Sequence, residues 1–224
     1  MVSDKCSMTR LPKLILASAS PRRAEILTAV GWEFEKSVAD VDESQLPEET
    51  AEDHVTRLAL TKAEAVAGNY KNALVLGADT IVVIDDQIIG KPKDLDDARR
   101  MLKMLSGNWH EVFTGVALVS VPSAVADGFA SASGFTTFNS PATAGVTDFV
   151  VDIQKTSVKF AELSDEEIEF LIEKGEPLDK AGAYAVQAQA ALFIEEIRGD
   201  YWNVVGLPVN LVYQLVRQYQ NPKR

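Results

Sequence analysis

The chain has 224 residues, of which 46% are hydrophobic and 25% are charged, as is usual for a soluble globular protein of enzyme size. No segment approaches the roughly 20 consecutive apolar residues of a membrane-spanning helix, so the composition gives no indication of a membrane partner. The net charge of −11 argues against a general DNA- or RNA-binding role, because proteins that bind nucleic-acid backbones normally present a basic face.

Residues 1–12 are expected to form a flexible N-terminal tail, and residues 13–219 are expected to form a single domain. No long apolar segment follows the N-terminus, so a signal peptide is not expected. The tail holds Cys6, the single cysteine of the chain, which cannot form an internal disulfide. A reducing, cytoplasmic location is therefore the default expectation.

In the first half of the domain, short apolar runs alternate with segments of helical periodicity. Thr50, with Asp53 three residues later, is typical of a helix start. The segment Ala78-Asp79-Thr80 interrupts a β-rich run, and Asp85-Asp86 indicates a two-residue turn. The expected elements are, in order, a strand at 13–18, a helix at 21–30, a strand at 32–39, a helix from Thr50 to about Gly68, and strands at 74–77, 81–84 and 87–89.

The second half begins with a helix that starts at Asp94 and Asp97 and ends at Gly107. Residues 122–146 are rich in Ala, Ser, Thr and Gly, so we expect them to form an exposed loop or an irregular hairpin extension inserted into the domain. The remaining elements are a strand at 110–121, a strand at 147–160, a helix from the capping box of Ser164 and Glu167 to Gly175, a strand near 191–198 and a helix from Leu207. Alternating strands and helices with hairpin signals predict an α/β fold with a mixed sheet.

The segment Ser18-Ala19-Ser20-Pro21-Arg22-Arg23 follows a short buried strand and opens a helix. Ser20 occupies the expected N-cap position, and Pro21 occupies the first helical position, where its missing N–H has no partner to lose. Free N–H groups at the helix start, two serine hydroxyls and two arginines are suited to binding phosphate. Taken alone, the motif is explained about equally well by an ordinary strand-to-helix junction with two solvated arginines.

Asp79 is a candidate for metal ligation or general-base chemistry, because its carboxylate interrupts an otherwise buried run at the expected end of a strand. The alternative is a turn aspartate that bonds its own backbone. Lys91 lies in the rigid turn Gly90-Lys91-Pro92, and Lys62 shares a helix face with apolar residues. Each of these lysines, taken alone, is more typical of a solvated surface residue.

Two later loops, at 176–187 and 203–208, combine small residues with charges or a glycine-proline pair, and such loops often carry function. An inconsequential charged turn and a purely structural junction are the respective alternatives. His54 and His110 lie far apart without ligand spacing and are interpreted as ordinary surface or core histidines. The sequence has no Ser-His-Asp set, zinc motif or dinucleotide glycine fingerprint.

Taken together, these segments resemble the Maf family, the septum-formation-inhibitor-like nucleoside triphosphate pyrophosphatases. They occur in the order of the family and cover nearly the whole chain from Lys13 to about Tyr219. The matching segments are 18–23, 41–43, 57–59 with 62–63, 77–80, 90–92, 105–107, 114–118, 176–184 and 204–208.

The resemblance implies an α/β fold of the Maf and ITPase-like kind, with a mixed twisted sheet, flanking helices and two lobes around a central cleft. It also implies hydrolysis of a nucleoside triphosphate to the monophosphate and pyrophosphate with a divalent cation, Mg²⁺ or Mn²⁺. By position, Asp79 matches the catalytic proton acceptor, and Glu43 together with Asp79 matches the metal ligands. The residues that match the phosphate-binding set are Ser18, Ser20, Arg23, Lys62 and Lys91. This assignment is chemically sensible, since a carboxylate can activate water beside a metal while cations stabilise charge on phosphate oxygens.

Within the resembled family, one branch acts on dTTP and UTP and another acts on 7-methyl-GTP. Arg22, Thr80 and Gln187 match the residues of the first branch at the positions that distinguish the two. A neutral Gln187 can satisfy both the carbonyl acceptors and the N–H donor of a pyrimidine. The resemblance therefore predicts specificity for dTTP and UTP.

The chain departs from the family pattern at Ala185 and Ala188, where glycines are common, in the length of 122–146 and in its N-terminal tail. Three hypotheses stay open: a dTTP/UTP pyrophosphatase, a related enzyme acting on modified nucleotides, and a nucleotide-binding regulator of cell division without turnover. Retention of the carboxylates favours turnover, since a pure binder needs no water-activating group. The expected partner is a nucleotide rather than nucleic acid or a membrane, and a homodimer is compatible with the resemblance.

Overall fold

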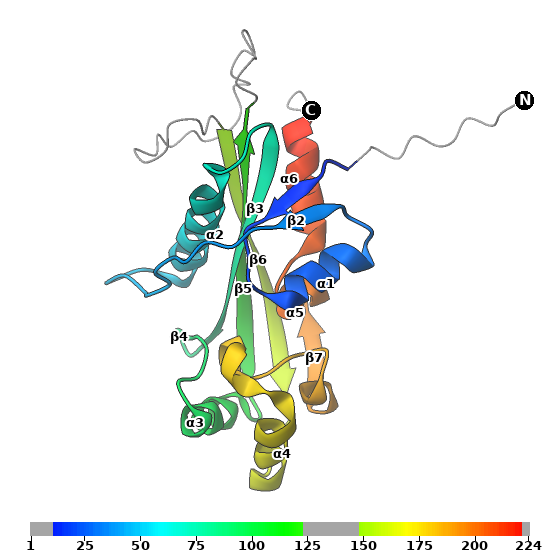
Figure 1. Cartoon of the computed structure of the whole chain (residues 1–224). Coiled ribbons are helices and arrows are strands. Elements are labelled where there is room, and N and C mark those ends of the chain that lie inside the picture. The colour runs from blue at the N-terminus through cyan, green and yellow to red at the C-terminus, as the bar shows by residue number, and fades with distance from the viewer. Residues whose placement is uncertain (1–10, 123–147, 221–224) are drawn as a thin grey trace, which may run out of the picture.

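The centre of the molecule is a seven-stranded sheet, which the computed structural model describes with its flanking helices for residues 11–122 and 148–220 (Figure 1). The strand order is β2-β1-β3-β5-β6-β7, and β4 pairs with β3 off this path. The pairs β2–β1 and β1–β3 are parallel, and the remaining pairs are antiparallel. The predicted α/β fold with a mixed sheet is confirmed.

Most predicted elements are present in the predicted order. The strands are β1 Leu14–Leu16, β2 Phe34–Lys36, β3 Ala73–Ile84, β4 Gln87–Ile89, β5 Trp109–Val121, β6 Asp148–Phe160 and β7 Ile194–Arg198. The helices are α1 Pro21–Ala29, α2 Ala51–Ala67, α3 Leu95–Leu105, α4 Asp165–Gly175, α5 Tyr201–Val205 and α6 Val209–Gln220, with the short 3₁₀ turns η1 Pro177–Asp179, η2 Ala181–Ala183 and η3 Gln189–Leu192. The predicted tail at 1–12 and extension at 122–146 lie, apart from residues 11, 12 and 122, outside the described residues.

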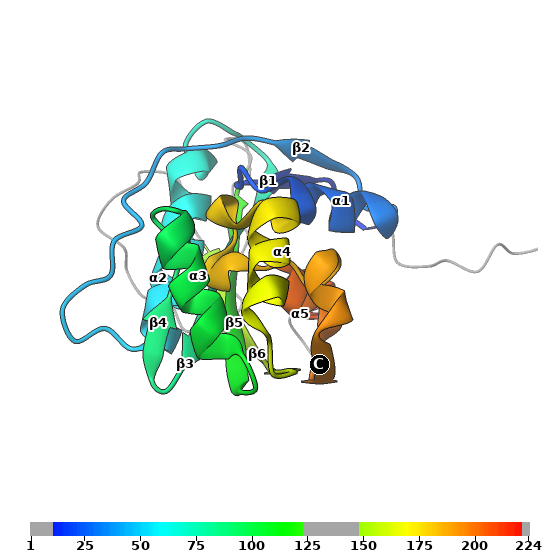
Figure 2. The ribbon, with the colours of Figure 1, turned by 90° about the horizontal axis from the view of Figure 1, so that it is seen from below.

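Two apolar layers cover the sheet, because alternate residues of a strand face opposite sides. Ile15 of β1 and Val75 of β3 pack against the small residues Ala59 and Ala63 of α2. The leucines that alternate with them on β1 and β3 join the larger core on the other face, which contains the apolar residues of α1 and α6. Figure 2 shows α1 and α2 on opposite sides of the long strands.

The long strands β3, β5 and β6 join two lobes (Figure 1). The upper lobe carries β1, β2, α1, α2 and α6, and in the lower lobe α3 packs on α4 beside β4 and β7. One edge of β3 pairs with β1 through Leu74–Leu76 and with β4 through Val82–Ile84. Residues 77–81 lie between these pairings, beside the carboxyl end of β1, where ligands commonly bind in α/β sheets.

Three helix starts follow their sequence signals. The side chains of Thr50, Asp94 and Ser164 each accept a hydrogen bond from the backbone N–H three residues later. Ser164 also forms the full predicted capping box with Glu167. The turn at Asp85-Asp86 has positive φ at both residues, as a tight β-hairpin requires.

The predicted break in the β-rich run is wrong. β3 continues without interruption from Ala73 to Ile84, so Asp79 lies within a strand and not at its end. The ladder continues because Asp79 is in register with Gly115 of β5. Its carboxylate is accommodated in the strand because it faces α2, where Lys62 donates a hydrogen bond to it.

The elements near the C-terminus also differ from prediction. Residues 189–192 form η3, so β7 begins later than the expected strand near 191. α5 was not predicted, and α6 begins at Val209 because Gly206, with φ 123°, and Pro208 separate the two helices.

Near the N-terminus, β2 covers only residues 34–36 of the predicted strand at 32–39.

Gly77 and Gly115 allow the backbone of α2 to lie directly on the sheet. A Cβ atom at Gly77 would lie 2.1 Å from the carbonyl oxygen of Ala59, and one at Gly115 would lie 2.3 Å from that of Val55. No side chain fits at these separations, so Gly77 of β3 and Gly115 of β5 set the distance between α2 and the sheet. That distance brings Lys62 within hydrogen-bonding reach of Asp79, the carboxylate of β3.

Gly77→Ala is expected to lower the free energy of unfolding by roughly 1–3 kcal/mol or more, because α2 must move away from β3. Gly175→Ala is the matched control, since a Cβ there meets nothing within 4 Å. The control should change stability by less than about 1 kcal/mol. Urea unfolding of both variants measures the difference, and equal stabilities would show that α2 does not depend on this close approach.

Candidate active site

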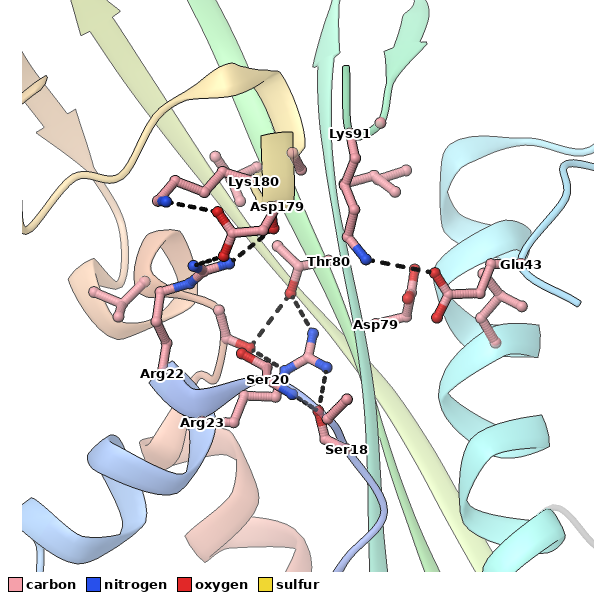
Figure 3. A pocket seen from close by; sticks show the side chains of 18 of the residues that line it. Ser18, Ser20, Arg22, Arg23, Glu43, Asp79, Thr80, Lys91, Asp179 and Lys180 are labelled. Atoms are coloured by element: carbon pink, nitrogen blue, oxygen red, sulfur yellow. Dashed lines mark hydrogen bonds and ion pairs between the residues drawn. The ribbon is translucent and has the colours of Figure 1, made fainter. Parts of the chain in front are cut away.

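A cavity of about 470 Å³ lies between the lobes, at the carboxyl end of β1. Each residue predicted to form a site lines this cavity: Ser18, Ser20, Arg22, Arg23, Glu43, Lys62, Asp79, Thr80, Lys91 and Gln187. In Figure 3, Asp79 and Glu43 lie on the side of α2, and Arg22 lies on the opposite side. The fold therefore brings together groups from the whole length of the domain.

The loop after β1 is held in place by backbone and side-chain hydrogen bonds. The N–H of Ala17 donates to the Leu76 carbonyl at 2.8 Å and continues the pairing with β3. Ser20 occupies the N-cap position of α1, as predicted, but its side chain makes no capping hydrogen bond. Its N–H instead donates to Ser18 Oγ at 3.2 Å. The predicted N-cap position of Ser20 is thus confirmed, and the loop folds back onto Ser18.

Arg23 is buried and donates four hydrogen bonds to protein acceptors. Nε donates to the Gly206 carbonyl at 2.8 Å, and Nη1 donates to Ser18 Oγ at 3.0 Å and to the Ala78 carbonyl at 2.8 Å. Nη2 donates to Thr80 Oγ1 at 3.0 Å. Burial lowers the pKa of Arg23, but a guanidinium remains charged at physiological pH. Its charge therefore acts on the cavity while most of its donors are engaged by the protein.

The Thr80 hydroxyl is likewise engaged by the protein. Besides accepting from Arg23, Thr80 Oγ1 lies 2.9 Å from Thr114 Oγ1 and 3.3 Å from the Gly206 carbonyl. One hydroxyl has a single donor and two acceptor lone pairs, so these contacts account for its capacity. In this structure Thr80 is a partner of the Arg23 guanidinium.

Lys62 joins two carboxylates at the cavity wall. Its Nζ lies 2.7 Å from Asp79 Oδ1 and 2.6 Å from Glu43 Oε1, and Lys91 Nζ lies 3.9 Å from Glu43 Oε2. The side chain of Asp79 is only 9% exposed, whereas that of Glu43 is 48% exposed. Burial alone would raise the pKa of Glu43, but hydrogen bonding and attraction from Lys62, with Lys91 and Arg23, outweigh it and lower the pKa.

Glu49 connects the start of α2 with the loop that contains Glu43. Its carboxylate accepts hydrogen bonds from Arg57 Nε at 2.5 Å and Nη2 at 2.8 Å, and it lies 2.9 Å from His54 Nδ1. Arg57 also donates to the Ser44 carbonyl, next to Glu43, at 3.0 Å. The hydrogen bonds from Arg57 lead the interactions that lower the pKa of Glu49 to about 2, against the opposing effect of burial. His54 is a core histidine with an acidic partner.

Asp79 and Glu43 are residues that could hold a hard divalent cation together with a phosphate ligand. Their carboxylate oxygens converge on one ammonium group, so they face the same space. Mg²⁺ is usually bound through one or two carboxylates together with substrate phosphates and water. Within residues 11–122 and 148–220, no group of three or more His, Cys, Asp or Glu side chains is arranged to hold a metal. Two carboxylates would leave most of the coordination positions of such a cation to other ligands.

The sequence indicated a functional loop at 176–187 but did not single out Asp179 and Lys180. Both line the cavity, and Arg22 Nη1 donates to Asp179 Oδ2 at 3.1 Å. Lys180 is 8% exposed and donates to the other oxygen of Asp179. An adjacent acid and base among small residues was the available signal, but the pairing of Asp179 with Arg22 depends on the tertiary fold.

His110 and Tyr184 belong to the apolar core beside this loop. His110 Nε2 lies 2.8 Å from Tyr184 Oη, and the two rings meet edge to face at 5.5 Å. Burial lowers the pKa of His110 to about 4 and raises that of Tyr184, so both side chains are neutral at physiological pH. The interpretation of His110 as an ordinary histidine agrees with this place in the core.

The similarity to known proteins extends over the whole domain. A family model described as Maf-like protein matches residues 13–219. The chain belongs to the Maf family. A relative from Symbiobacterium thermophilum named dTTP/UTP pyrophosphatase is 44% identical over 212 residues, which cover 95% of this chain and 96% of that protein. A relative of the same name from Geotalea uraniireducens is 47% identical over 205 residues, which cover 92% and 94%.

The solved structure of the Staphylococcus aureus Ham1 protein aligns with 92% of this Maf-family chain and 99% of its own length, at 14% identity and a TM-score of 0.48. Among the helices that the structure describes, none is long and apolar enough to cross a membrane.

In this Maf-family protein, Glu49→Gln is expected to lower the free energy of unfolding at pH 7 by roughly 2 kcal/mol. The folded-state pKa of about 2 lies below the unfolded value near 4.5, so the carboxylate stabilises the fold fully above about pH 4.5. This contribution is lost as the pH falls toward 2. The difference between wild type and variant in urea unfolding should therefore shrink over that range.

Arg57→Gln provides the control background for Glu49→Gln. With Arg57 replaced, the second substitution should cost much less, because the main partner of the carboxylate is gone. A pH-independent difference, or equal costs in both backgrounds, would contradict the role given to this pair.

Proposed function

We propose that the protein hydrolyses dTTP and UTP to the nucleoside monophosphate and pyrophosphate. The observation that carries this proposal is the cavity itself, in which two carboxylates and a cluster of cations face each other at the start of α1. A triphosphate needs such cations, because the protein as a whole carries a net charge of −11. The names of the relatives from S. thermophilum and G. uraniireducens support the same activity.

In the proposed reaction, a water oxygen attacks the α-phosphorus, and the bond from this phosphorus to the α,β-bridging oxygen breaks. Pyrophosphate leaves, and the proton of the attacking water passes to the Asp79 carboxylate. Lys62 holds that carboxylate in place through its 2.7 Å contact. Lys91, the buried charge of Arg23 and the N-terminal end of α1 offset the negative charge on the phosphate oxygens.

The proposal includes a divalent cation, Mg²⁺ or Mn²⁺, held by Asp79 and Glu43 together with the phosphates. When bound, such a cation supplies charge stabilisation and orients the triphosphate. Hard oxygen donors and the open donor set described above support this choice.

Base selection is assigned to Arg22, Thr80 and Gln187. Gln187 and Arg22 face the cavity directly, whereas Thr80 would act through Arg23. The amide of Gln187 can donate to a carbonyl and accept from the N–H of a pyrimidine. Ala188, at a position where the family commonly has glycine, has a negative φ of −121°, so this position does not use the left-handed conformation that favours glycine.

Modified pyrimidine triphosphates that keep the same hydrogen-bonding edge are included in the proposed substrates. The cytoplasmic location, the absence of nucleic-acid partners and a homodimer stay predictions, as does the link to cell-division arrest. Each can be tested separately from catalysis.

The proposal is tested by measuring the pyrophosphate that the purified protein releases from dTTP, UTP, dCTP, dGTP, dATP and 7-methyl-GTP. Each triphosphate is assayed with Mg²⁺ or Mn²⁺ and with excess chelator. We expect dTTP and UTP to give the highest kcat/KM, because other bases leave the polar groups that they cover on binding unpaired. Activity should vanish in chelator and return with either metal. Gln187→Glu should lower pyrimidine turnover more than it weakens metal binding.

Several results would overturn the proposal. The best substrate could prove to be 7-methyl-GTP, or all triphosphates could be cleaved equally well. Release of orthophosphate in place of pyrophosphate would place the attack at another phosphorus. Full activity in chelator would exclude the shared cation.

Asp79→Asn is expected to lower kcat by at least about 10²–10⁴-fold, because it removes the proton acceptor while keeping the size of the side chain. Asp85→Asn is the matched control, in the exposed turn after β3, where asparagine tolerates the left-handed backbone. Steady-state kinetics and unfolding curves of both variants make the comparison. Wild-type turnover by Asp79→Asn would remove this residue from the mechanism.

A further inference from the structure

Arg22 and Asp179, which both line the cavity, connect the two lobes through a direct contact (Figure 3). Arg22 is the second residue of α1 in the upper lobe, and Asp179 ends η1 in the lower lobe. Arg22 Nη1 donates to Asp179 Oδ2 at 3.1 Å, and Nη2 donates to the Asp179 backbone carbonyl at 3.4 Å. Two terminal nitrogens of one guanidinium are thus directed by a single residue, 157 positions away in the chain.

Lys180 fixes the other side of the Asp179 carboxylate. Its Nζ donates to Asp179 Oδ1 at 2.6 Å and to the Glu176 carbonyl at 2.5 Å. The Lys180 side chain is only 10% exposed, and Glu176 ends α4 in a left-handed conformation with φ 47°. The two oxygens of Asp179 therefore accept from two different cations, and the carboxylate has a defined orientation.

This arrangement does more than form a surface ion pair. Exposed ion pairs contribute little to stability, typically about 0–1 kcal/mol, so stability alone does not account for a three-residue arrangement at the cavity. The Arg22 side chain is 22% exposed and lines the cavity, and among the described residues Nε and one hydrogen on each terminal nitrogen have no acceptor. Asp179 also precedes Gln187 by eight residues in the same loop.

The loop that contains Asp179 is also joined to the turn that carries Lys91. The N–H of Gly182 donates to the Gly90 carbonyl at 3.0 Å. Gly182 has φ +69°, and a Cβ there would lie 3.0 Å from the Val82 side chain. This loop is therefore held against β3 and the turn at Gly90 that follows β4. Because Asp179 belongs to the loop and binds Arg22, the place of the loop sets the place of the Arg22 guanidinium.

We propose that Asp179 is a positioning residue for base selection, which orients Arg22 toward the carbonyl oxygens of a pyrimidine and relative to Gln187. Lys180 acts with it by fixing the carboxylate. This inference rests on the proposed function, because it assigns the selection of dTTP and UTP to that same cavity.

A double-mutant cycle on the full-length protein tests the proposal. Asp179→Ala should lower kcat/KM for dTTP by about 10–100-fold, mainly through KM, because a misplaced Arg22 loses orientation. The value for dGTP should change by less than about threefold, since the pyrimidine contact is absent there. Arg22→Ala should have a similar effect, and the double variant should be no worse than Arg22→Ala alone. Asp165→Ala, which removes an exposed ion pair with Lys103 in the same lobe, is the control and should leave both values unchanged.

The same cycle is repeated without turnover by measuring, with calorimetry, the Kd of a non-hydrolysable dTTP analogue for wild type, the two single variants and the double variant. We expect the Kd to rise in Asp179→Ala and Arg22→Ala without further rise in the double variant. Additive effects, equal losses for dTTP and dGTP, or tighter binding by Asp179→Ala would overturn the positioning role. If wild type released no pyrophosphate from any triphosphate, the proposed function would fail, while the binding cycle would still decide whether Asp179 acts through Arg22.

Discussion

The cavity depends on the hydrogen bonds that the buried guanidinium of Arg23 donates. This guanidinium is hydrogen-bonded to the loop after β1, to β3 and to the turn between α5 and α6, three segments that are distant in sequence. Removal of the guanidinium would leave several buried acceptors without donors, at a cost of about 1–3 kcal/mol for each. The same group supplies a fixed positive charge at the cavity floor. Arg23 therefore combines a structural and an electrostatic role, whereas Arg22 keeps donors available for a ligand.

The second constraint is the close approach of α2 to the sheet. Gly77 and Gly115 leave room for the α2 backbone, and the carboxylate of Asp79 then faces Lys62 within a strand that is otherwise apolar on this side. The two constraints act on neighbouring parts of β3. Residues 77–81 lie between the pairings with β1 and β4, so side chains from both faces of the sheet reach one cavity.

Charge pairing explains how an acidic protein can keep a cationic cavity. Lys62 is paired with Asp79 and Glu43, and Arg22 is paired with Asp179, whereas the buried Arg23 donates to neutral carbonyl and hydroxyl oxygens. Such pairing limits the cost of removing the cations from water. The proposed triphosphate would meet cations whose positions are already fixed, which reduces the ordering that binding requires.

The sequence by itself determined the elements with local signals, namely the capped helix starts, the hairpin turn and the mixed order of strands and helices. The family's motifs also identified ten of the residues that line one cavity, because those residues lie in short contiguous segments. Only the tertiary structure decided that Asp79 lies inside a strand, that Arg23 is held by Ala78 and Gly206, and that Asp179 directs Arg22. These features depend on hydrogen bonds between residues far apart in the chain, and no local pattern specifies such partners, because they meet only when the sheet brings the two lobes together.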